Sequence, residues 1–253
     1  MSGESLLLRP LLGVPRVVAG DDPAAIALAA IETMNESLRD GDVLVFAQKI
    51  ISKAEGRSVD LNNVTPSPLA LRLAEATAKD ARLVELILQE SSEVLRHRPG
   101  LLIVVHRLGF VLANAGIDHS NVDHDARVLL LPVDPDGSAA RIRSEVKRLT
   151  GIDIGVLIID SLGRAWRMGT VGTAIGVSGL PGLIDLRGRP DLNGHPLETT
   201  EIGFADELAA AASLMMGQAD EATPIVLARG VPYARRDGTA GELLRPKERD
   251  LFR

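Results

Sequence analysis

The hydrophobic positions of this 253-residue chain follow two different periods, which predict strands and helices in turn. Short, unbroken aliphatic runs predict buried strands at residues 42–49, 101–107, 128–132, 152–160 and 223–230. Apolar residues spaced three and four apart predict helices at residues 24–38, 68–77, 80–95, 134–149 and 204–216. Helices and strands alternate, so we expect a mixed α/β (α+β) fold, and the pattern leaves the relative direction of the strands open.

Turn and cap residues mark the ends of several predicted helices. Pro23 suits a first helical turn, and either Asp136 or Ser138 is expected to cap the helix at 134–149. The pair Pro99-Gly100 is expected to stop the helix at 80–95. These residues give each helix a predicted start or stop.

A glycine-rich stretch at residues 169–182 contains five glycines, which indicates a backbone that turns sharply or approaches another group closely. The chain shows neither a repeat of fixed period nor a Gly/Ser-rich or Pro-rich linker. We therefore expect one domain over residues 1–253, or two interlocked subdomains.

Composition narrows the functional classes. Aromatic residues make up 2% of the chain, so the core must be aliphatic and base-stacking platforms for nucleic acid are scarce. The net charge of −6 also argues against general attraction to nucleic acid or to an anionic membrane. Without cysteine, thiolate metal sites and cysteine nucleophiles are excluded. No apolar run is long enough for a membrane span or a signal peptide, so we expect a cytoplasmic protein.

Two carboxylates stand where apolar segments run into polar ones. Asp118 follows the segment FVLANAGI, and Asp160 follows IGVLII. Ligand sites collect at such ends in α/β proteins, and hard divalent cations bind carboxylate, water and phosphate oxygens. A metal site is one interpretation. The other is that Asp118 caps a turn and Asp160 caps a helix.

The polar cluster after Asp118 admits a similar choice. His119 and His124 lie among aspartates, but their spacing matches no standard zinc pattern, which favours a surface role. Asn121 could place its amide on a phosphate or on a metal-bound water. On the residues alone, both interpretations stay open.

Two pairs of cations are candidates for anion binding. Lys49 and Lys53 lie four apart at the end of a predicted strand, where they could neutralise phosphates or form a solvated surface pair. Arg164 and Arg167 flank Trp166, where they could bind an anion or pack on the indole ring. The chain has neither the P-loop motif nor the Rossmann glycine motif, so a nucleotide would need another kind of site.

Seven segments, taken together and in order, resemble the family of ligases that attach L-glutamate to coenzyme F420-0. They are GVPRVVAGDD at 13–22, DGDVLVFAQKIISKAEGR at 40–57, KDARLVELILQES at 79–91, GFVLANAGIDHSNV at 109–122, IIDSLGRAWRMGTVGTAIG at 158–176, DLRGRPDLNGHPLETT at 185–200 and ADELAAAASLMMGQADEATPIVLARG at 205–230. The resemblance covers almost the whole chain. Two positions depart from the family pattern, Arg16 and Ala165.

The resemblance implies a GTP-dependent ligase that adds one or more glutamates to F420-0. The implied route passes through an acyl phosphate and releases GDP and phosphate. Manganese or magnesium is the implied metal, with potassium as a candidate additional ion. The implied fold is that of the F420 glutamyl ligases, an intertwined homodimer with active sites near the interface, here without the C-terminal reductase-like domain of some relatives.

Residue by residue, the resemblance implies metal ligation by Asp118 and Asp160, with Ser161 and Gln218 completing a second metal site. Nucleotide contacts are implied for three segments and for Asn121. Their residues are Gly13, Val14, Pro15 and Arg16; Gln48, Lys49 and Lys53; and the loop 216–223, which includes Met216, Gly217 and Gln218. Arg164 and Arg167 are our candidates for binding anionic substrate groups.

Two other functions remain compatible with the sequence. One is a related ligase that uses another amino acid or another phosphorylated carboxylate substrate. The other is a GTP-binding regulator without catalytic activity, which the joint presence of Asp118, Asp160, Lys49 and Lys53 disfavours.

Overall fold

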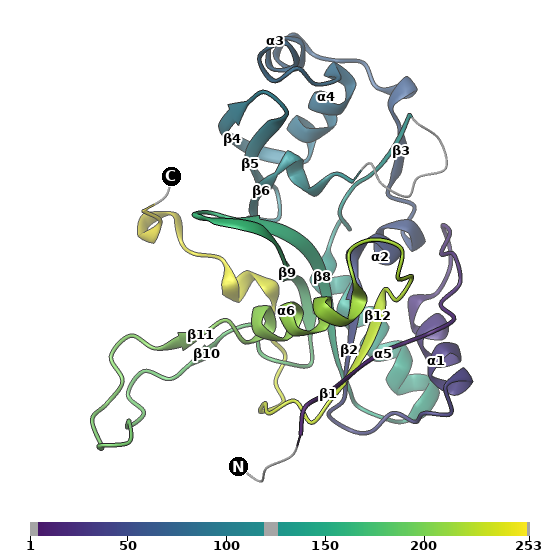
Figure 1. Cartoon of the computed structure of the whole chain (residues 1–253), viewed down its shortest axis with the longest axis vertical. Coiled ribbons are helices and arrows are strands. Elements are labelled where there is room, and N and C mark those ends of the chain that lie inside the picture. Colours follow the sequence, from purple (N-terminus) through teal and green to yellow (C-terminus); the bar gives the residue numbers. More distant parts are fainter. Residues whose placement is uncertain (1–4, 119–125, 252–253) are drawn as a thin grey trace.

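A computed structural model describes residues 5–118 and 126–251 of the chain. Its centre is a five-stranded sheet in the order β1-β12-β2-β8-β9, in which only β2 and β8 are parallel (Figure 1). The strands of this sheet are β1 (Leu7–Pro10), β2 (Val43–Ala47), β8 (Gly155–Arg164), β9 (Arg167–Ser178) and β12 (Ile225–Arg229). The mixed α+β class expected from the sequence is therefore confirmed.

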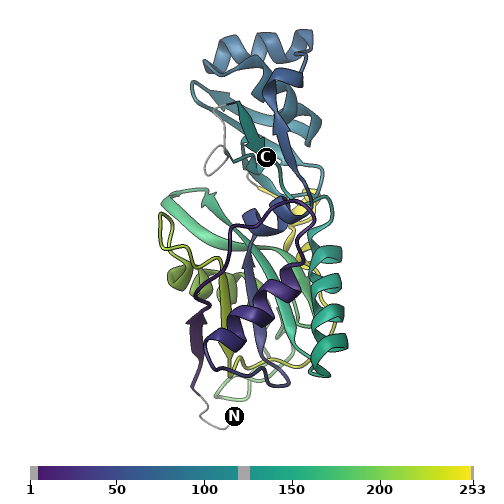
Figure 2. The same ribbon diagram turned by 90° about the vertical axis from the view of Figure 1, so that its right-hand side faces the viewer.

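Helices cover both faces of this sheet, and we call the whole unit the sheet lobe. Its helices are α1 (Pro23–Thr33), α2 (Gln48–Ala54), α5 (Pro135–Thr150) and α6 (Phe204–Met216). Figure 2 shows α1 and α5 together on one side, and α6 lies on the opposite side. The chain then adds a two-stranded arm, β10 (Ile184–Asp185) and β11 (Glu201–Ile202), and short 3-10 turns η3 (Ala240–Leu243) and η4 (Lys247–Arg249).

A second unit, residues 58–130, is inserted between α2 and α5, and we call it the inserted lobe. Its elements are β3 (Ser58–Asp60), η1 (Leu61–Asn63), α3 (Pro68–Thr77), α4 (Ala81–Gln89), β4 (Ser91–Arg98), β5 (Leu101–His106), β6 (Val111–Ala113), η2 (Asn114–Gly116) and β7 (Arg127–Leu129). It has buried clusters of its own, whereas Phe110 and Leu112 join the large core of the sheet lobe. These two side chains pack the lobes together.

Continuous apolar runs explain the central strands. Val43, Leu44, Val45 and Phe46 of β2 are fully buried because both faces of the sheet are covered. Each such side chain contributes about 1.5–3 kcal/mol through its removal from water. The buried strands thus hold the end of β2 and the middle of β8 in fixed positions.

A β-bulge in β9 explains the glycine-rich stretch. The register of β8 and β9 passes from Gly176 to Ala174 and skips Ile175. Because of this extra residue, positions an even number apart across the bulge, such as Gly172 and Gly176, face opposite sides of the sheet. A Cβ atom on Gly172 would collide with Ser213 of α6, and one on Gly176 would collide with Pro135 of α5. The close backbone approach expected for this segment is confirmed.

Several predicted boundaries were wrong, most clearly for the helix at 80–95. The helix α4 ends at Gln89, and residues 91–98 form β4, which pairs with β5 through the turn at Pro99-Gly100. Strand pairing outweighs the weak helical preference of Ser91 and Ser92. The pair Pro99-Gly100 therefore joins two strands instead of stopping a helix.

Other boundaries shift for local reasons. The first helix ends at Thr33 because Asn35 adopts a positive φ of 54°, so it does not reach residue 38. The cap of α5 is Asp134, which accepts a hydrogen bond from the Gly137 N–H, and neither Asp136 nor Ser138 is the cap. The predicted strand at 128–132 is confined to β7.

Within the described ranges, no helix is both long enough and apolar enough to cross a bilayer.

Candidate active site

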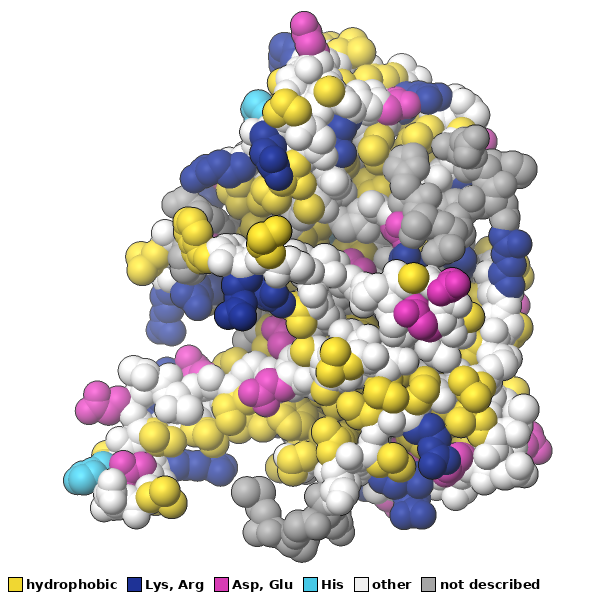
Figure 3. Space-filling model, in the orientation of Figure 1, with side chains coloured by type: hydrophobic (Ala, Val, Ile, Leu, Met, Phe, Trp, Pro, Cys, Tyr) yellow, Lys and Arg dark blue, Asp and Glu magenta, His cyan; other side chains and the backbone are white. Residues whose placement is uncertain are grey.

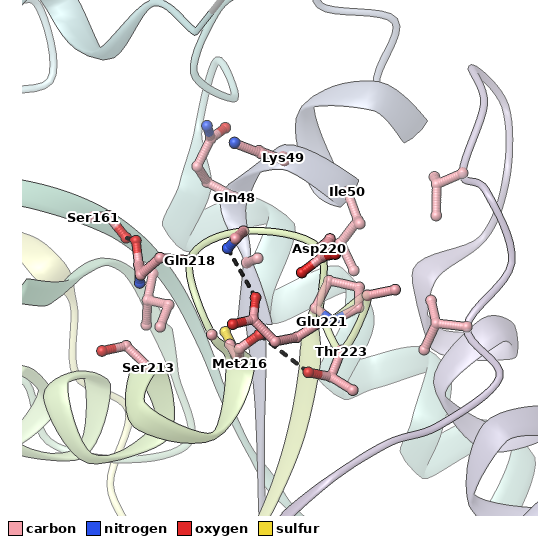
Figure 4. A pocket seen from close by; sticks show the side chains of 18 of the residues that line it. Gln48, Lys49, Ile50, Ser161, Ser213, Met216, Gln218, Asp220, Glu221 and Thr223 are labelled. Atoms are coloured by element: carbon pink, nitrogen blue, oxygen red, sulfur yellow. Dashed lines mark hydrogen bonds between the residues drawn. The ribbon is translucent and has the colours of Figure 1, made fainter. Parts of the chain in front are cut away.

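A cavity of about 460 Å³ opens where β2 ends and α2 begins. Four segments form its walls: the loop after β1, the first turns of α2, residues 159–161 of β8, and the end of α6 with the loop that joins it to β12 (Figure 4). Its lining residues are Val14, Pro15, Arg16, Val17, Ala47, Gln48, Lys49, Ile50, Lys53, Ile159, Asp160, Ser161, Ser213, Met216, Gly217, Gln218, Ala219, Asp220, Glu221, Ala222, Thr223 and Pro224. The volume suits a ligand of nucleotide size.

The start of α2 brings the two lysines to the cavity. Ala47 keeps an extended conformation and the helix begins at Gln48, so Lys49 and Lys53 lie one turn apart on the same face. On the other side of the helix, Ile51 is buried in the core. Burial lowers the pKa of Lys53, and the positive charges of Arg16 and Lys49 lower it further, against the opposing charge of Asp118. Three cations are thus concentrated at one wall.

The two candidate metal ligands come from different lobes. Asp118 exchanges two backbone hydrogen bonds of 2.9 Å with Leu129 in the inserted lobe, and its Oδ2 atom lies 2.8 Å from the Lys49 Nζ. Asp160 lies in β8, next to Ile159, which pairs with the last residue of β2. The structure places Asp160 inside a strand that continues to Arg164, so the expected strand end, and the alternative of a helix cap, are both wrong.

The protonation of Asp160 reflects its surroundings. Burial raises its pKa to about 6, and the negative charge of Asp118 adds to this effect. A hydrogen bond from the Ser161 N–H and the positive charge of Lys49 act in the opposite direction. Two carboxylates whose charges repel each other, one of them buried, form an oxygen donor set that a divalent cation would stabilise.

The loop after α6 supplies further polar groups. The Ser161 hydroxyl donates a hydrogen bond of 2.8 Å to the Gln218 side-chain oxygen, so these two predicted residues meet at the cavity wall. Gly217 has φ 72° and ψ −176°, a conformation that is almost restricted to glycine. At the far end of the loop, Thr223 donates to the Met216 carbonyl at 3.1 Å and closes the loop on itself.

The N-terminal loop forms the wall near α2. Val14, Pro15 and Arg16 line the cavity, whereas Gly13 is not among the lining residues. Gly13 has a positive φ of 73°, which turns the chain toward α2 after β1. Gly13 therefore shapes the turn of the chain and does not itself form part of the cavity wall.

Some predicted site residues lie elsewhere. Arg164 and Arg167 are at the exposed end of the β8–β9 hairpin, and the Arg164 guanidinium donates to the Met168 carbonyl at 3.3 Å. Arg164 is four residues beyond Asp160 on an extended strand, roughly 13 Å along it, so it does not line the cavity. Asn121, His119 and His124 lie outside the described residues.

Sequence reasoning missed part of the wall. Ser213 lines the cavity because it lies three residues before Met216, on the same face of α6, and this helical spacing was a signal that could have identified it. Val17 and Ile50 supply apolar surface next to the cations. Nothing in their sequence context distinguishes them from core residues.

In chemical terms, this arrangement suits a phosphorylated ligand with a divalent cation. Lys49, Lys53 and Arg16 can neutralise phosphate oxygens, and the two aspartates offer hard oxygen donors. Across the two described ranges, no group of three or more His, Cys, Asp or Glu side chains could hold a metal ion. A cation bound here would therefore be completed by neutral oxygens, water or the ligand.

Comparison with known proteins identifies relatives along almost the whole chain. The model of the F420-0:Gamma-glutamyl ligase family matches residues 12–230. A protein from Methanothermobacter thermautotrophicus named coenzyme F420:L-glutamate ligase is 51% identical over 95% of this chain and 96% of its own length. Proteins of the same name from Methanocaldococcus jannaschii and Methanopyrus kandleri are 45% and 44% identical, covering 85% and 98% of this chain and 86% and 98% of their own lengths.

The family match extends through every wall of the cavity, from the loop after β1 to β12. The chain therefore belongs to the F420-0:gamma-glutamyl ligase family.

Proposed function

We propose that this protein is a GTP-dependent ligase that joins L-glutamate to coenzyme F420-0 and releases GDP and phosphate. Membership of the family and the names of the relatives support glutamate ligation to this coenzyme. The observation that carries the proposal is that Lys49, Lys53 and Asp160 line one cavity, while Asp118, which is not itself a lining residue, is paired with Lys49 at 2.8 Å. Phosphoryl transfer depends on this kind of positioning and charge neutralisation.

The residues that we propose for a Mn²⁺ or Mg²⁺ ion are Asp118, Asp160, Ser161 and Gln218. Burial raises the pKa of Asp160 and the negative charge of Asp118 raises it further, which fits a site that gains stability when a cation is bound. The metal would supply positive charge next to the phosphate oxygens. Whether potassium assists is a further point that ion replacement would decide.

In the first chemical step, a carboxylate oxygen of F420-0 forms a bond to the terminal phosphorus of GTP. The bond from that phosphorus to the bridging oxygen breaks, and GDP leaves with the electron pair. Lys49 and Lys53 are placed to bind the phosphate oxygens and to offset the negative charge on GDP. The product is an acyl phosphate.

In the second step, the amine of glutamate attacks the acyl carbon, and the C–O bond to phosphate breaks. Inorganic phosphate leaves, and the amine loses a proton as the amide forms. Since phosphate is a good leaving group, the protein needs no nucleophilic side chain, which agrees with the absence of cysteine. Repetition of the cycle on the product would add further glutamates.

The direct test is to incubate purified protein with Mn²⁺, GTP, L-glutamate and F420-0. We expect the mass of the coenzyme to increase by one or more glutamyl residues, with one GDP released for each. The same reaction with other amino acids and other phosphorylated carboxylates tests the substrate range. Tight GTP binding with no GDP formed from any acceptor would instead indicate a regulator and would contradict the proposal.

We further propose that two copies of the chain form an intertwined homodimer. The arm that carries β10 and β11 extends away from the sheet lobe, and Leu192 near its end is fully exposed (Figure 1). Apolar side chains also gather over the end of the β8–β9 hairpin, where Trp166 is 86% and Met168 97% exposed (Figure 3). A second copy that covers these surfaces would remove them from water.

A further inference from the structure

Asp220 is a carboxylate in the cavity that the mechanism above does not use. It lies in the loop between α6 and β12 and lines the cavity. Within residues 5–118 and 126–251, its side chain makes no hydrogen bond and no ion pair. Both of its oxygens are therefore available to a ligand.

The neighbouring carboxylate, Glu221, is already engaged by the loop. Its Oε2 atom accepts a hydrogen bond of 2.8 Å from the Ala219 N–H. This bond, with others from the backbone N–H groups of Glu221 and Gln218, lowers the pKa of Glu221. Glu221 thus stabilises the loop, and of the two adjacent acids only Asp220 has its acceptors free.

Asp220 lies in a cavity that also offers apolar surface. In Figure 4, Asp220 lies on the side of Ile50, across the loop from Ser161 and Gln218. The apolar side chains of the lining are Val14, Pro15, Val17, Ile50 and Pro224, together with Met216 and alanines. A cavity that combines apolar side chains with a few polar groups is the kind of site that binds a heterocyclic base.

We propose that Asp220 selects guanine by accepting hydrogen bonds from the N1–H and the N2 amino group of the base. This inference rests on the proposed use of GTP and assigns the nucleotide specificity to one residue. The two donors on that edge of guanine are parallel and match the two oxygens of a carboxylate. Adenine presents an unprotonated N1 acceptor there, which would face the negative charge of Asp220 without a proton between them.

The proposed pairing predicts a specificity change, because Asn in place of Asp exchanges one acceptor for a donor. An asparagine carboxamide can accept from N1–H and donate to a carbonyl oxygen at C2, which is the pattern of xanthine. With guanine, its NH₂ group would face the N2 amino group, donor against donor. Asp220→Asn should therefore favour xanthosine nucleotides over guanosine nucleotides.

The experiment measures the Kd values of GDP, xanthosine diphosphate (XDP) and ADP by isothermal titration calorimetry in the presence of Mn²⁺. The proteins are the wild-type chain, Asp220→Asn, Glu221→Gln and Glu75→Gln, the last an exposed carboxylate on α3 remote from the cavity. For Asp220→Asn we expect GDP binding to weaken by about 10-fold to 100-fold and XDP binding to become tighter than GDP binding. Glu75→Gln should match the wild type, and Glu221→Gln should gain no preference for XDP.

Two results would overturn the inference while leaving the proposed function intact: Asp220→Asn that still prefers GDP over XDP, or a switch to XDP in Glu221→Gln. If the wild type binds ADP as tightly as GDP, the proposed use of GTP fails together with the inference. Since the decisive result is a gain of XDP binding, a loss of folding in the variant cannot imitate it.

Discussion

Lys49 holds the most informative contact of the site, an ion pair of 2.8 Å between its Nζ atom and the Asp118 Oδ2. The lysine also lowers the pKa of Asp160, although burial and the charge of Asp118 outweigh this effect. One cation thus offsets part of the charge on two carboxylates. A divalent ion at the same place would take over this role and leave Lys49 to bind phosphate.

The first prediction concerns the substitution Asp118→Asn. It removes the negative charge that pairs with Lys49 but keeps the side-chain volume, so the fold should persist. We expect kcat to fall by at least about 100-fold, the loss typical for removal of a group that organises transition-state charge. Steady-state rates and circular dichroism check this, with Glu75→Gln as the control. Near-normal turnover would remove Asp118 from the active site.

The second prediction concerns Gly217→Ala. Its φ of 72° and ψ of −176° disfavour any side chain, and a Cβ atom there would overlap the Glu221 carboxyl group. We expect a loss of about 1–3 kcal/mol in the free energy of unfolding and weaker GDP binding. Gly241→Ala is the matched control, because its φ is not positive and no atom lies closer than 3.5 Å. Equal stability and affinity in the two variants would contradict the assigned strain.

Single residues also show what sequence reasoning can reach. Lys49 and Lys53 were identified because they lie four apart after a predicted buried strand, whereas the helix α2, which brings them to one face, was not predicted and begins inside the expected strand. Arg164 was a candidate for binding an anionic group because of its place beside Trp166, whereas it lies at the exposed end of the hairpin that β8 forms with β9. The apolar run predicted the strand only to residue 160, and its polar continuation to Arg164 follows from pairing with β9, which the run does not indicate.

At the level of elements, the C-terminal tail is attached to the arm by one carboxylate. Glu242 in η3 accepts hydrogen bonds from the backbone N–H groups of Gly182 and Leu183 at 3.1 and 3.0 Å. Arg236 donates to both of its oxygens at 2.6 Å. Hydrogen bonds from Arg236 bring the pKa of Glu242 to about 2, although burial acts in the opposite direction.

The third prediction follows from this pKa. A carboxyl group whose pKa falls from 4.5 to about 2 on folding stabilises the folded state above pH 4.5, and this contribution is lost as the pH falls toward 2. Glu242→Gln should lower the free energy of unfolding at pH 7 by about 1 kcal/mol, after allowance for solvent screening, and flatten its pH dependence over that range.

Urea unfolding at a series of pH values measures this effect. Glu248→Gln, an exposed residue of the same tail, is the control and should behave like the wild type. Identical pH profiles for wild type and Glu242→Gln would show that the tail is held by other contacts.

The elements that the sequence predicted best are those with strong local signals. The helix α6 was predicted with its observed bounds because its apolar spacing is regular and Gly217 follows it. In contrast, β4 carries Ser, Glu, Arg and His and was taken for the end of a helix. It becomes a strand because it forms a hairpin with β5 through the turn at Pro99-Gly100, and the apolar spacing of the segment does not indicate this pairing.

At the scale of the whole molecule, an ionic cluster around the buried Glu90 joins the lobes. Glu90, at the end of α4, lies 2.9 Å from the Arg57 guanidinium and 3.0 Å from that of Arg107. Arg57 also donates to the Leu131 carbonyl at 2.8 Å. Arg57 and Leu131 flank the inserted lobe in sequence, so the cluster fixes both of its connections at one point.

The fourth prediction concerns assembly. If two copies cover each other's exposed apolar surfaces, light scattering during size-exclusion chromatography should give twice the mass of one chain. Leu192→Asp, near the end of the arm, should reduce the dimer fraction, whereas Leu251→Asp, also exposed but in the C-terminal tail, should not. Wild-type protein that elutes with the mass of one chain would contradict the proposed homodimer.

Because the chain is divided into two lobes, substitutions far from the cavity can affect the geometry of the site. Asp118 enters the site from the inserted lobe and Asp160 from the sheet lobe, so the spacing of the two carboxylates depends on the angle between the lobes. A substitution beneath α3 or α4 that rotates the inserted lobe slightly would alter that spacing while every residue of the cavity stays the same. Under the proposed function, such a substitution would change the catalytic rate without altering the loop that we propose binds the nucleotide.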